Sequence, residues 1–264
     1  MSGSSDPELL RRLVEFELSL ERDSSEIVEE FEWGRLIHNP GTPDLFSGNY
    51  LDLRSTDLDV ETLAAIADEV QSPLEGIKHR DIVPADPAHG ERLAPGFEAL
   101  EGWDVVRTVY MVLTREPDRE VGLAREVERA AVLSVRRAVA DDDPEIIQEA
   151  VEQRFVHDDR LGRAGNGRWF AAPPDGPPGA SCVLYGRDGI GQVETVGTIP
   201  ESRGEGLASA VVVGAAEASR ERGDELTFIV ADPDDWPWRL YERLGFDRVG
   251  ELCSFLRKPP SPSE

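Results

Sequence analysis

The strongest constraint on the fold is an order of elements that the chain contains twice. The segments "DIVPADPAHGERLAPGFEALEGWDVVRTVYMVL" (81–113) and "FIVADPDDWPWRLYERLGFDRVGELCSFLR" (228–257) both run strand, acidic turn with proline, helix, glycine plus aromatic residue, strand. Such an internal repeat predicts two copies of one supersecondary plan. The alternative is a coarse likeness that any two segments of alternating strand and helix share. In the overlay the matched pairs are Phe97 with Tyr241, Gly102 with Gly245, and Trp103 with Phe246.

Hydrophobic periodicity and turn residues predict the elements around the repeat. A polar stretch at 115–120 is the expected boundary, which divides 1–115 from 116–258 and leaves 259–264 as a disordered tail. In the first part we expect helices over 6–23, 59–70 and 87–100, and strands over 29–40, 48–55, 80–86 and 104–115. In the second part we expect helices over 124–143, 144–156, 203–222 and 234–244, and strands over 168–173, 180–187, 191–198, 226–232 and 248–258.

The composition limits the partners of the chain. Its formal charge of -25 excludes nucleic acid and anionic membrane, because neutralising phosphates needs basic surface. No apolar run approaches the roughly 18 residues that span a bilayer, and the N-terminus has no secretory pattern. Cys182 and Cys253 fall in expected strands and give neither a disulfide framework nor a metal-ligand spacing. We therefore expect a cytoplasmic protein without a metal, acting as a monomer or homodimer.

A glycine-rich loop, "PESRGEGLASA" (200–210), joins an expected strand to an expected helix. The first turn of a helix has backbone N–H groups without partners and carries partial positive charge. Phosphates bind there when side chains leave room. Gly204 and Gly206 would keep the backbone open, Ala208 would keep the first turn slim, and Arg203 would add charge. The loop therefore predicts a site for a diphosphate.

Two kinds of nucleotide site share such a loop. Gly204-x-Gly206 occurs in dinucleotide folds, but a Rossmann domain needs several further strand–helix units, and only about sixty residues follow here. The other interpretation uses two motifs, "VETVGTIPESRGEGLASAV" (193–211) and, downstream, "LYERLGF" (240–246). Together they resemble the GNAT family of acetyl-CoA-dependent N-acetyltransferases. The resemblance covers about residues 120–258.

The resemblance implies an α/β (α+β) fold in which helices flank a mixed, mostly antiparallel central sheet. It also implies a tandem arrangement, because the first half looks like a degenerate copy without a phosphate loop. Acetyl-CoA is then the co-substrate. Its pantetheine arm pairs with the strand Gln192–Thr198, as a peptide strand would, and a backbone N–H near Val196 or Gly197 polarises the thioester carbonyl. The expected co-substrate contacts are Val196, Gly197, Thr198, Arg203, Gly204, Glu205, Gly206, Leu207, Ala208, Ser209 and Asp234, the last in place of an asparagine frequent in the family.

The resemblance also assigns roles to two side chains. In the attack of an amine on a thioester, the ammonium must first lose a proton and the departing thiolate gains one. Tyr241 matches the general acid of the family, whereas its counterpart Phe97 has no proton to give; the alternative for Tyr241 is a packing role. Glu194 is the candidate base, directly or through water, since strand alternation gives it the same parity as Val196 and Thr198. The alternative for Glu194 is a solvated carboxylate.

We therefore expect an enzyme that transfers acetyl from acetyl-CoA to a primary amine of a small molecule or peptide terminus, in a ternary complex and without an acyl-enzyme. The alternatives are a non-catalytic acyl-CoA-binding sensor and an O-acyl or longer-acyl transferase. Two acidic segments, "ADDDPE" (140–145) and "FVHDDR" (155–160), are expected to be a helix cap and a solvated helix end rather than cation sites. Trp236 and Trp238 are candidates for the acceptor pocket or the core.

Overall fold

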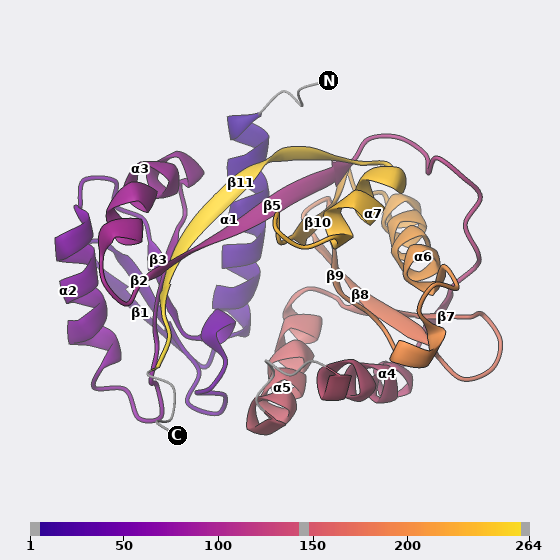
Figure 1. The fold of residues 1–264 in the computed structure, drawn as a ribbon, viewed down its shortest axis with the longest axis horizontal. Helices are drawn as coiled ribbons and strands as arrows, with labels where there is room; N and C mark the ends of the chain where they lie inside the picture. Colours follow the sequence, from indigo (N-terminus) through magenta and orange to yellow (C-terminus); the bar gives the residue numbers. More distant parts are fainter. Residues whose placement is uncertain (1–5, 143–147, 260–264) are drawn as a thin grey trace.

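The structure is a computed structural model that describes residues 6–142 and 148–259. In these residues eleven strands form one sheet, in the order β1-β2-β3-β4-β11-β5-β10-β9-β8-β7-β6, with helices packed along its length (Figure 1). The pairs β3–β4 and β9–β10 are parallel, and the other neighbouring pairs are antiparallel. The mixed, mostly antiparallel sheet predicted from the sequence is therefore confirmed.

The bounds of the elements follow. The helices are α1 (Pro7–Ser24), α2 (Val60–Gln71), α3 (Pro87–Ala99), α4 (Arg129–Asp142), α5 (Gln148–Ala164), α6 (Leu207–Arg222) and α7 (Pro237–Arg243), with short 3₁₀ turns at Phe46–Gly48 and Pro200–Ser202. The strands are β1 (Ile27–Phe31), β2 (Gly34–His38), β3 (Tyr50–Leu53), β4 (Arg80–Pro84), β5 (Asp104–Leu113), β6 (Arg125–Val127), β7 (Arg168–Ala172), β8 (Ala180–Arg187), β9 (Ile190–Thr198), β10 (Leu226–Ala231) and β11 (Phe246–Arg257).

The two halves of the chain exchange a strand. β11, from the C-terminal half, lies between β4 and β5 of the N-terminal half, and β5 in turn lies between β11 and β10. The two exchanged strands run antiparallel, from the pair Phe246–Leu113 to the pair Leu256–Asp104. They form the long central ribbons that cross from one side of the molecule to the other (Figure 1). Neither half therefore completes its part of the sheet alone.

The internal repeat predicted from the sequence is present. The units β4–α3–β5 and β10–α7–β11 have the same order of elements, and their second strands are the exchanged pair. Gly102 and Gly245, matched in the overlay, both have left-handed backbone angles, with φ of 83° and 98°. This backbone region favours glycine, which explains why both copies have it after the helix. The N-terminal half is thus a second, degenerate copy of the fold.

Local sequence signals explain most helix ends. Asp6, Asp59 and Asp86 precede α1, α2 and α3, and each side chain accepts a hydrogen bond from a backbone N–H of the first helical turn. Such caps satisfy donors that lack an intrahelical partner. At the other end of α6, Gly223 has φ of 89° and ends the helix as predicted.

The single strand predicted over 29–40 is wrong, because the chain forms a hairpin there. β1 and β2 pair antiparallel around a turn at Glu32–Trp33. Gly34 follows the turn with φ of 147°, and a Cβ at this position would lie 2.1 Å from the backbone oxygen of Asp52. A residue with a side chain does not fit this close approach, so the glycine fixes where the hairpin turns.

Two further boundaries differ from the prediction. A short strand, β6, pairs with β7 where a helix was expected from residue 124. α5 extends to Ala164, well beyond the predicted end at 156. Residues 143–147 lie outside the described residues. They include the end of the predicted helix over 124–143, the start of the predicted helix over 144–156 and part of "ADDDPE". Residues 260–264 of the predicted tail also lie outside the described residues.

The hydrophobic core crosses between the halves. One cluster packs Leu13 and Phe16 of α1 against Tyr185 of β8 and Phe228 of β10. Cys182 and Cys253 are free and buried, as predicted for core residues. Among the described residues, no helix is both long and apolar enough to cross a bilayer. The boundary at 115 separates the two copies of the sequence repeat, but the sheet and the core continue across it. That 1–115 and 116–258 are separate domains therefore stays a prediction.

Candidate active site

The glycine-rich loop enters α6 through two left-handed glycines. Gly204 and Gly206 have φ of 82° and 81°, and Gly206 is the N-cap of α6. A Cβ built at either position meets no atom within 4 Å, so both face open space. Glycine is therefore required here by backbone conformation rather than by crowding.

The loop leaves a run of backbone donors without partners. In the part of the chain that the structure describes, the N–H groups of residues 204–209 donate to no backbone or side-chain acceptor, whereas the next one, of Ala210, donates to Gly206 O at 3.1 Å. Six consecutive free N–H groups at the start of a helix form a site for an anion, because they add to the positive end of the helix dipole.

The strand before the loop is open on one side. β9 pairs with β10 only as far as Val193 and Ile229. On its other side β9 continues to pair with β8 up to Thr198. Residues 194–198 therefore have a neighbouring strand on one edge only, among the described residues. An open edge of this kind pairs with an extended ligand that carries amide groups.

Three cavities lie in a row along this open stretch of β9. The first, of about 240 Å³, is lined by Glu194 and Thr195, with several carboxylates from α1 and α5, and is called the acidic cavity below. The second, of about 160 Å³, is lined by Thr195, Val196 and Gly197. The third, of about 590 Å³, is lined by Val196, Gly197, Thr198 and the glycine-rich loop and is called the loop cavity. One strand is thus a common wall from the loop to the acidic groups.

Comparison with known proteins identifies this arrangement. Residues 180–254, from β8 to β11, match the family described as FR47-like protein. Mycothiol acetyltransferase of Kineococcus radiotolerans is 27% identical over 195 residues, which are 65% of this chain and 61% of that protein. A GCN5-related N-acetyltransferase from Kribbella flavida has the same fold over 98% of both chains, with a TM-score of 0.63 and 18% identity. The predicted resemblance of the C-terminal half to the GNAT family is confirmed by these matches.

A second relative matches more closely over a shorter stretch. Mycothiol acetyltransferase of Thermobispora bispora is 43% identical over 65 residues, which are 24% of this chain and 22% of that protein. The chain thus spans about three-fifths of the length of the first curated relative, and less of this one.

The structure brings most of the residues expected from GNAT proteins into one place. Ten of them line the loop cavity: Val196, Gly197, Thr198, Arg203, Gly204, Gly206, Leu207, Ala208, Ser209 and Tyr241. Glu205 lines a neighbouring cavity on the other side of the loop. Asp234 lines neither of these two cavities; its side chain is exposed and its backbone N–H donates to Asp232 Oδ1 at 2.7 Å. The structure therefore does not place Asp234 with the other expected residues.

Tyr241 lies in the wall of the loop cavity on α7. It is 7% exposed and packs its ring edge against Phe246, with centroids 6.5 Å apart. Burial, and next the negative charge of Glu194, raise the pKa of the phenol above its usual value. The hydroxyl therefore stays protonated at neutral pH, which is the state a proton donor needs. Phe97, its counterpart, stacks on Phe255 in the N-terminal core at 4.0 Å.

Glu194 lies in the acidic cavity rather than in the loop cavity. Its Oε2 accepts the backbone N–H of Thr195 at 2.9 Å, and its Oε1 accepts Gln192 Nε2 at 3.2 Å. Burial raises the pKa of this carboxyl above its usual value, and Asp158 and Glu21 raise it further. A carboxylate with a raised pKa is a stronger proton acceptor near neutral pH. The alternative of a solvated strand carboxylate does not fit this position.

The parity expected along β9 is wrong beyond Glu194. β9 has one more residue than β8 between the pairs Glu194–Val183 and Gly197–Ser181, and Thr195 has φ of 51°. An extra residue of this kind is a β-bulge, which reverses the alternation of side chains beyond it. Glu194 therefore lies on the face opposite to Thr198, and this separates it from the loop cavity.

Arg119 had no signal in the sequence, whereas Arg203, Trp236 and Trp238 were candidates whose contacts the sequence left open. Arg119, on the connection between the halves, lines the loop cavity and the cavity beside Glu205. Trp236 is 58% exposed and lines the loop cavity, while Trp238 packs against the core below. Arg203 forms an ion pair with Asp142 at 2.7 Å, on the exposed side of α4. A connection between elements has no sequence pattern that marks a cavity-lining residue such as Arg119, so only the fold reveals it.

The segment "FVHDDR" is not a solvated helix end, contrary to expectation. His157 and Asp158 are buried within α5, each 4% exposed. His157 contacts Glu21 of α1 at 3.1 Å, and Asp158 pairs with Arg136 of α4. Both line the acidic cavity. Among the described residues no group of three or more His, Cys, Asp or Glu side chains has the geometry of a metal site.

Proposed function

We propose that this protein transfers an acetyl group from acetyl-CoA to a primary amine of a small molecule or a peptide terminus, by direct attack in a ternary complex. One observation carries the proposal. The open edge of β9, six free N–H groups at the start of α6 and a protonated phenol border one continuous wall of cavities. Each of these features suits a different part of one acyl thioester of coenzyme A.

The residues that are present fit acetyl-CoA. The free N–H groups of 204–209 and the Arg203 guanidinium would hold the diphosphate. Val196, Gly197 and Thr198 would pair with the pantetheine amides through their unpaired edge. Arg119 offers a further cation to the phosphates from the connection between the halves. Acetyl-CoA supplies an activated acyl group, and family members use it.

The chain's own residues would then handle two protons. The acceptor ammonium has three N–H bonds and the product amide has one, so the nitrogen loses two protons in all. Glu194 takes the first proton, which frees the lone pair that forms the C–N bond. As the C–S bond breaks, Tyr241 gives its phenolic proton to the sulfur and recovers one from the nitrogen. One proton remains on Glu194 and leaves to water.

The names of the relatives support a small acceptor. Two matched proteins are described as mycothiol acetyltransferases, which act on a small molecule. The acidic cavity, of about 240 Å³, also suits a small amine. The acceptor of this chain is therefore sought among small cationic amines.

The test is turnover with acetyl-CoA and a panel of primary amines, read as release of free thiol. Tyr241→Phe should lower kcat about 100-fold, because a positioned general acid contributes roughly that much, while acetyl-CoA binding stays within about twofold. Tyr50→Phe is the matched control, since Tyr50 is a buried tyrosine on β3 that lines none of the three cavities. It should turn over like the wild type.

Two results would contradict the proposal. If Tyr241→Phe turns over like the wild type, the phenol is not the acid. If acetyl-CoA binds but no amine in the panel causes thiol release, the non-catalytic acyl-CoA sensor becomes the better account. An alcohol acceptor that outperforms every amine would favour O-acyl transfer.

A further inference from the structure

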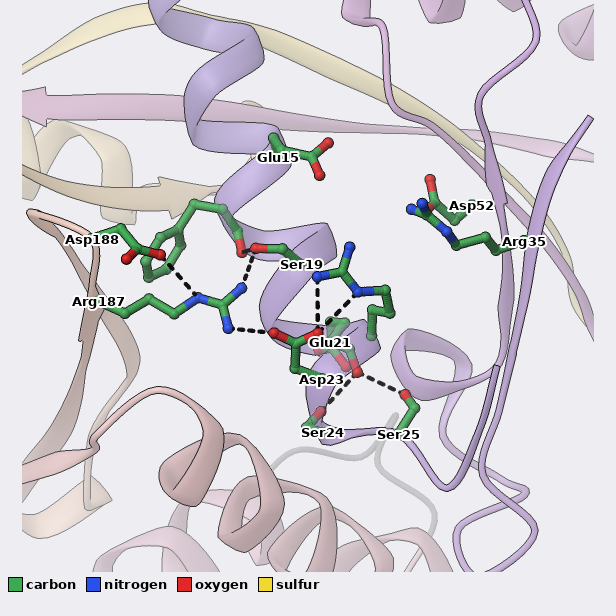
Figure 2. Close-up of polar contacts among 12 residues, drawn as sticks. Glu15, Ser19, Glu21, Asp23, Ser24, Ser25, Arg35, Asp52, Arg187 and Asp188 are labelled. Atoms are coloured by element: carbon green, nitrogen blue, oxygen red, sulfur yellow. Dashed lines mark hydrogen bonds and ion pairs between the residues drawn. The ribbon is translucent and has the colours of Figure 1, made fainter. Parts of the chain in front are cut away.

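Helix α1 of the N-terminal half is fixed to the strands that carry the candidate site. Arg187, at the end of β8, donates to Asp23 Oδ2 at 2.6 Å and to the hydroxyl of Ser19. Figure 2 shows this guanidinium reaching from the strand to both side chains of α1. The Arg187 side chain is 19% exposed and that of Asp23 is 40% exposed, so the contact lies at the rim of the protein. It joins β8 to α1, and α1 forms a wall of the acidic cavity with Glu17, Leu20 and Glu21.

The α1 wall places a second carboxyl beside Glu194. The side-chain amide of Gln192 donates from Nε2 to Glu17 Oε1 at 2.5 Å and to Glu194 Oε1 at 3.2 Å. The other oxygen of Glu17 accepts the hydroxyl of Tyr110 on β5, and the other oxygen of Glu194 accepts the backbone N–H of Thr195. One amide thus joins two carboxyl groups, and each group is oriented at both of its oxygens.

We propose that Glu17, which belongs to the N-terminal half, is a positioning residue for the reaction of the C-terminal half. Through Gln192 it forms one carboxyl pair with Glu194. This pair accepts the proton of the acceptor ammonium. The inference rests on the proposed function and adds to it a role for the N-terminal half. The helix that carries Glu17 and the strand that carries Tyr110 both belong to that half, so the degenerate copy completes the reaction site.

The charges around the pair support this role. Burial, and next the charge of Glu194, raise the pKa of Glu17 to about 8. Two carboxyl groups this close titrate as a unit, and with this pKa Glu17 keeps its proton at neutral pH. The titratable and charged groups that face the pair from the surrounding elements are Glu21, Tyr110, Arg136, Arg154, His157, Asp158, Tyr185 and Tyr241.

The cavity in front of the pair has polar groups that no protein atom satisfies. The hydroxyl of Tyr185, a residue 1% exposed, and Nδ1 of His157, 4% exposed, have no hydrogen-bond partner, and both residues line the acidic cavity. Buried polar groups are normally paired, so these two mark a place where a polar ligand binds. Both groups lie beside the carboxyl pair, where an acceptor that carries an ammonium and a hydroxyl would supply their missing hydrogen bonds.

The proton transfer balances within this arrangement. One N–H bond of the acceptor ammonium breaks, one O–H bond forms on the pair, and the electron pair stays on nitrogen as the lone pair of a neutral amine. Glu17 keeps its own proton at this pH and, through Gln192, orients Glu194, which is the member of the pair that takes the proton.

The experiment compares Glu17→Gln with wild type by two measurements. Infrared titration of carboxyl groups should show that the step of Glu17 near pH 8 is missing from Glu17→Gln and moves to lower pH in Glu194→Gln, because the charge of Glu194 raises the pKa of Glu17. The pH profile of kcat/KM of Glu17→Gln should lose the same step, with a plateau about three- to tenfold lower. Glu194→Gln identifies the infrared band.

Two further variants sharpen the test. Asp81→Asn is the matched control, because burial also raises the pKa of Asp81 to about 8, but Asp81 lies on β4 away from the cavity. Asp81→Asn should leave the pH profile of kcat/KM unchanged. Tyr110→Phe, which removes a donor that lowers the pKa of Glu17, should shift the pair upward, and it serves if Glu17→Gln does not fold.

The outcomes separate the two proposals. A Glu17 titration near pH 8 that does not move in Glu194→Gln, or an equal change of the kcat/KM profile in Asp81→Asn, overturns the carboxyl pair. If wild type shows no amine-dependent turnover, the proposed function fails, and the infrared titration still decides whether the pair exists.

Discussion

At the scale of single residues, the two glycines that flank α6 show what the glycine-rich loop does. Gly206 begins the helix and Gly223 ends it, with φ of 81° and 89°, and a Cβ at either position meets open space. The two share backbone strain and differ in surroundings, because only Gly206 lines the loop cavity. They therefore separate a conformational role from a binding role.

Gly206→Ala and Gly223→Ala should destabilise the protein by a similar amount, about 1 kcal/mol each, since an L-residue in this region is strained. Only Gly206→Ala should also weaken acetyl-CoA, with Kd raised at least about tenfold. Denaturant unfolding and calorimetric titration measure the two effects. Equal acetyl-CoA affinity in both variants would show that the loop glycines do not form the anion site.

A buried carboxyl sets the pH dependence of stability at the same scale. Asp81 is 9% exposed, and burial raises its pKa to about 8. The folded state therefore holds a proton that the unfolded chain loses near pH 4, so stability falls as pH rises from about 4 to 8. Asp81→Asn should remove on the order of 2–4 kcal/mol of this fall in unfolding free energy. Unfolding curves at pH 5 and pH 8 that respond to pH as the wild type does would contradict this assignment.

At the scale of elements, the sequence predicted what local signals determine. The end of α6 at Arg222 and the repeated unit around Gly102 and Gly245 both depend on neighbours within a few residues. The short strand β6 was missed, since three residues carry no periodicity to distinguish them from the helix that follows. The hairpin at Gly34 was missed, because alternation alone does not mark where a strand turns back.

Part of the candidate site was also predicted from the sequence. The loop and the open strand lie in the motif 193–211, Tyr241 lies in the motif 240–246, and all three meet in the loop cavity. The bulge at Thr195 could not be predicted, because threonine rarely adopts a positive φ and gives no signal for it. Glu17 could not be predicted either, since its partners Gln192 and Tyr110 are distant in sequence. Contacts between the halves depend on the strand exchange, and that exchange has no local cause.

At the scale of the whole molecule, the exchanged strands make the two halves depend on one another. β10 and β11 both pair with β5, and β4 pairs with β11. If 116–264 is produced without 1–115, the two strands lose their shared neighbour and the apolar side chains of the cluster around Phe228 meet water. The isolated fragment should therefore fail to bind acetyl-CoA, and mixing it with 1–115 should restore binding. A fragment that binds like the intact protein would establish 116–258 as an independent domain.

The central claim is that the free N–H groups of residues 204–209 bind the diphosphate of a coenzyme. Calorimetry on the wild-type protein with acetyl-CoA and with S-acetylpantetheine, which lacks the diphosphate, tests it most directly. The account predicts saturable binding of acetyl-CoA and an affinity for S-acetylpantetheine that is at least about tenfold lower. Equal affinities for the two compounds, or no binding of acetyl-CoA, would contradict it.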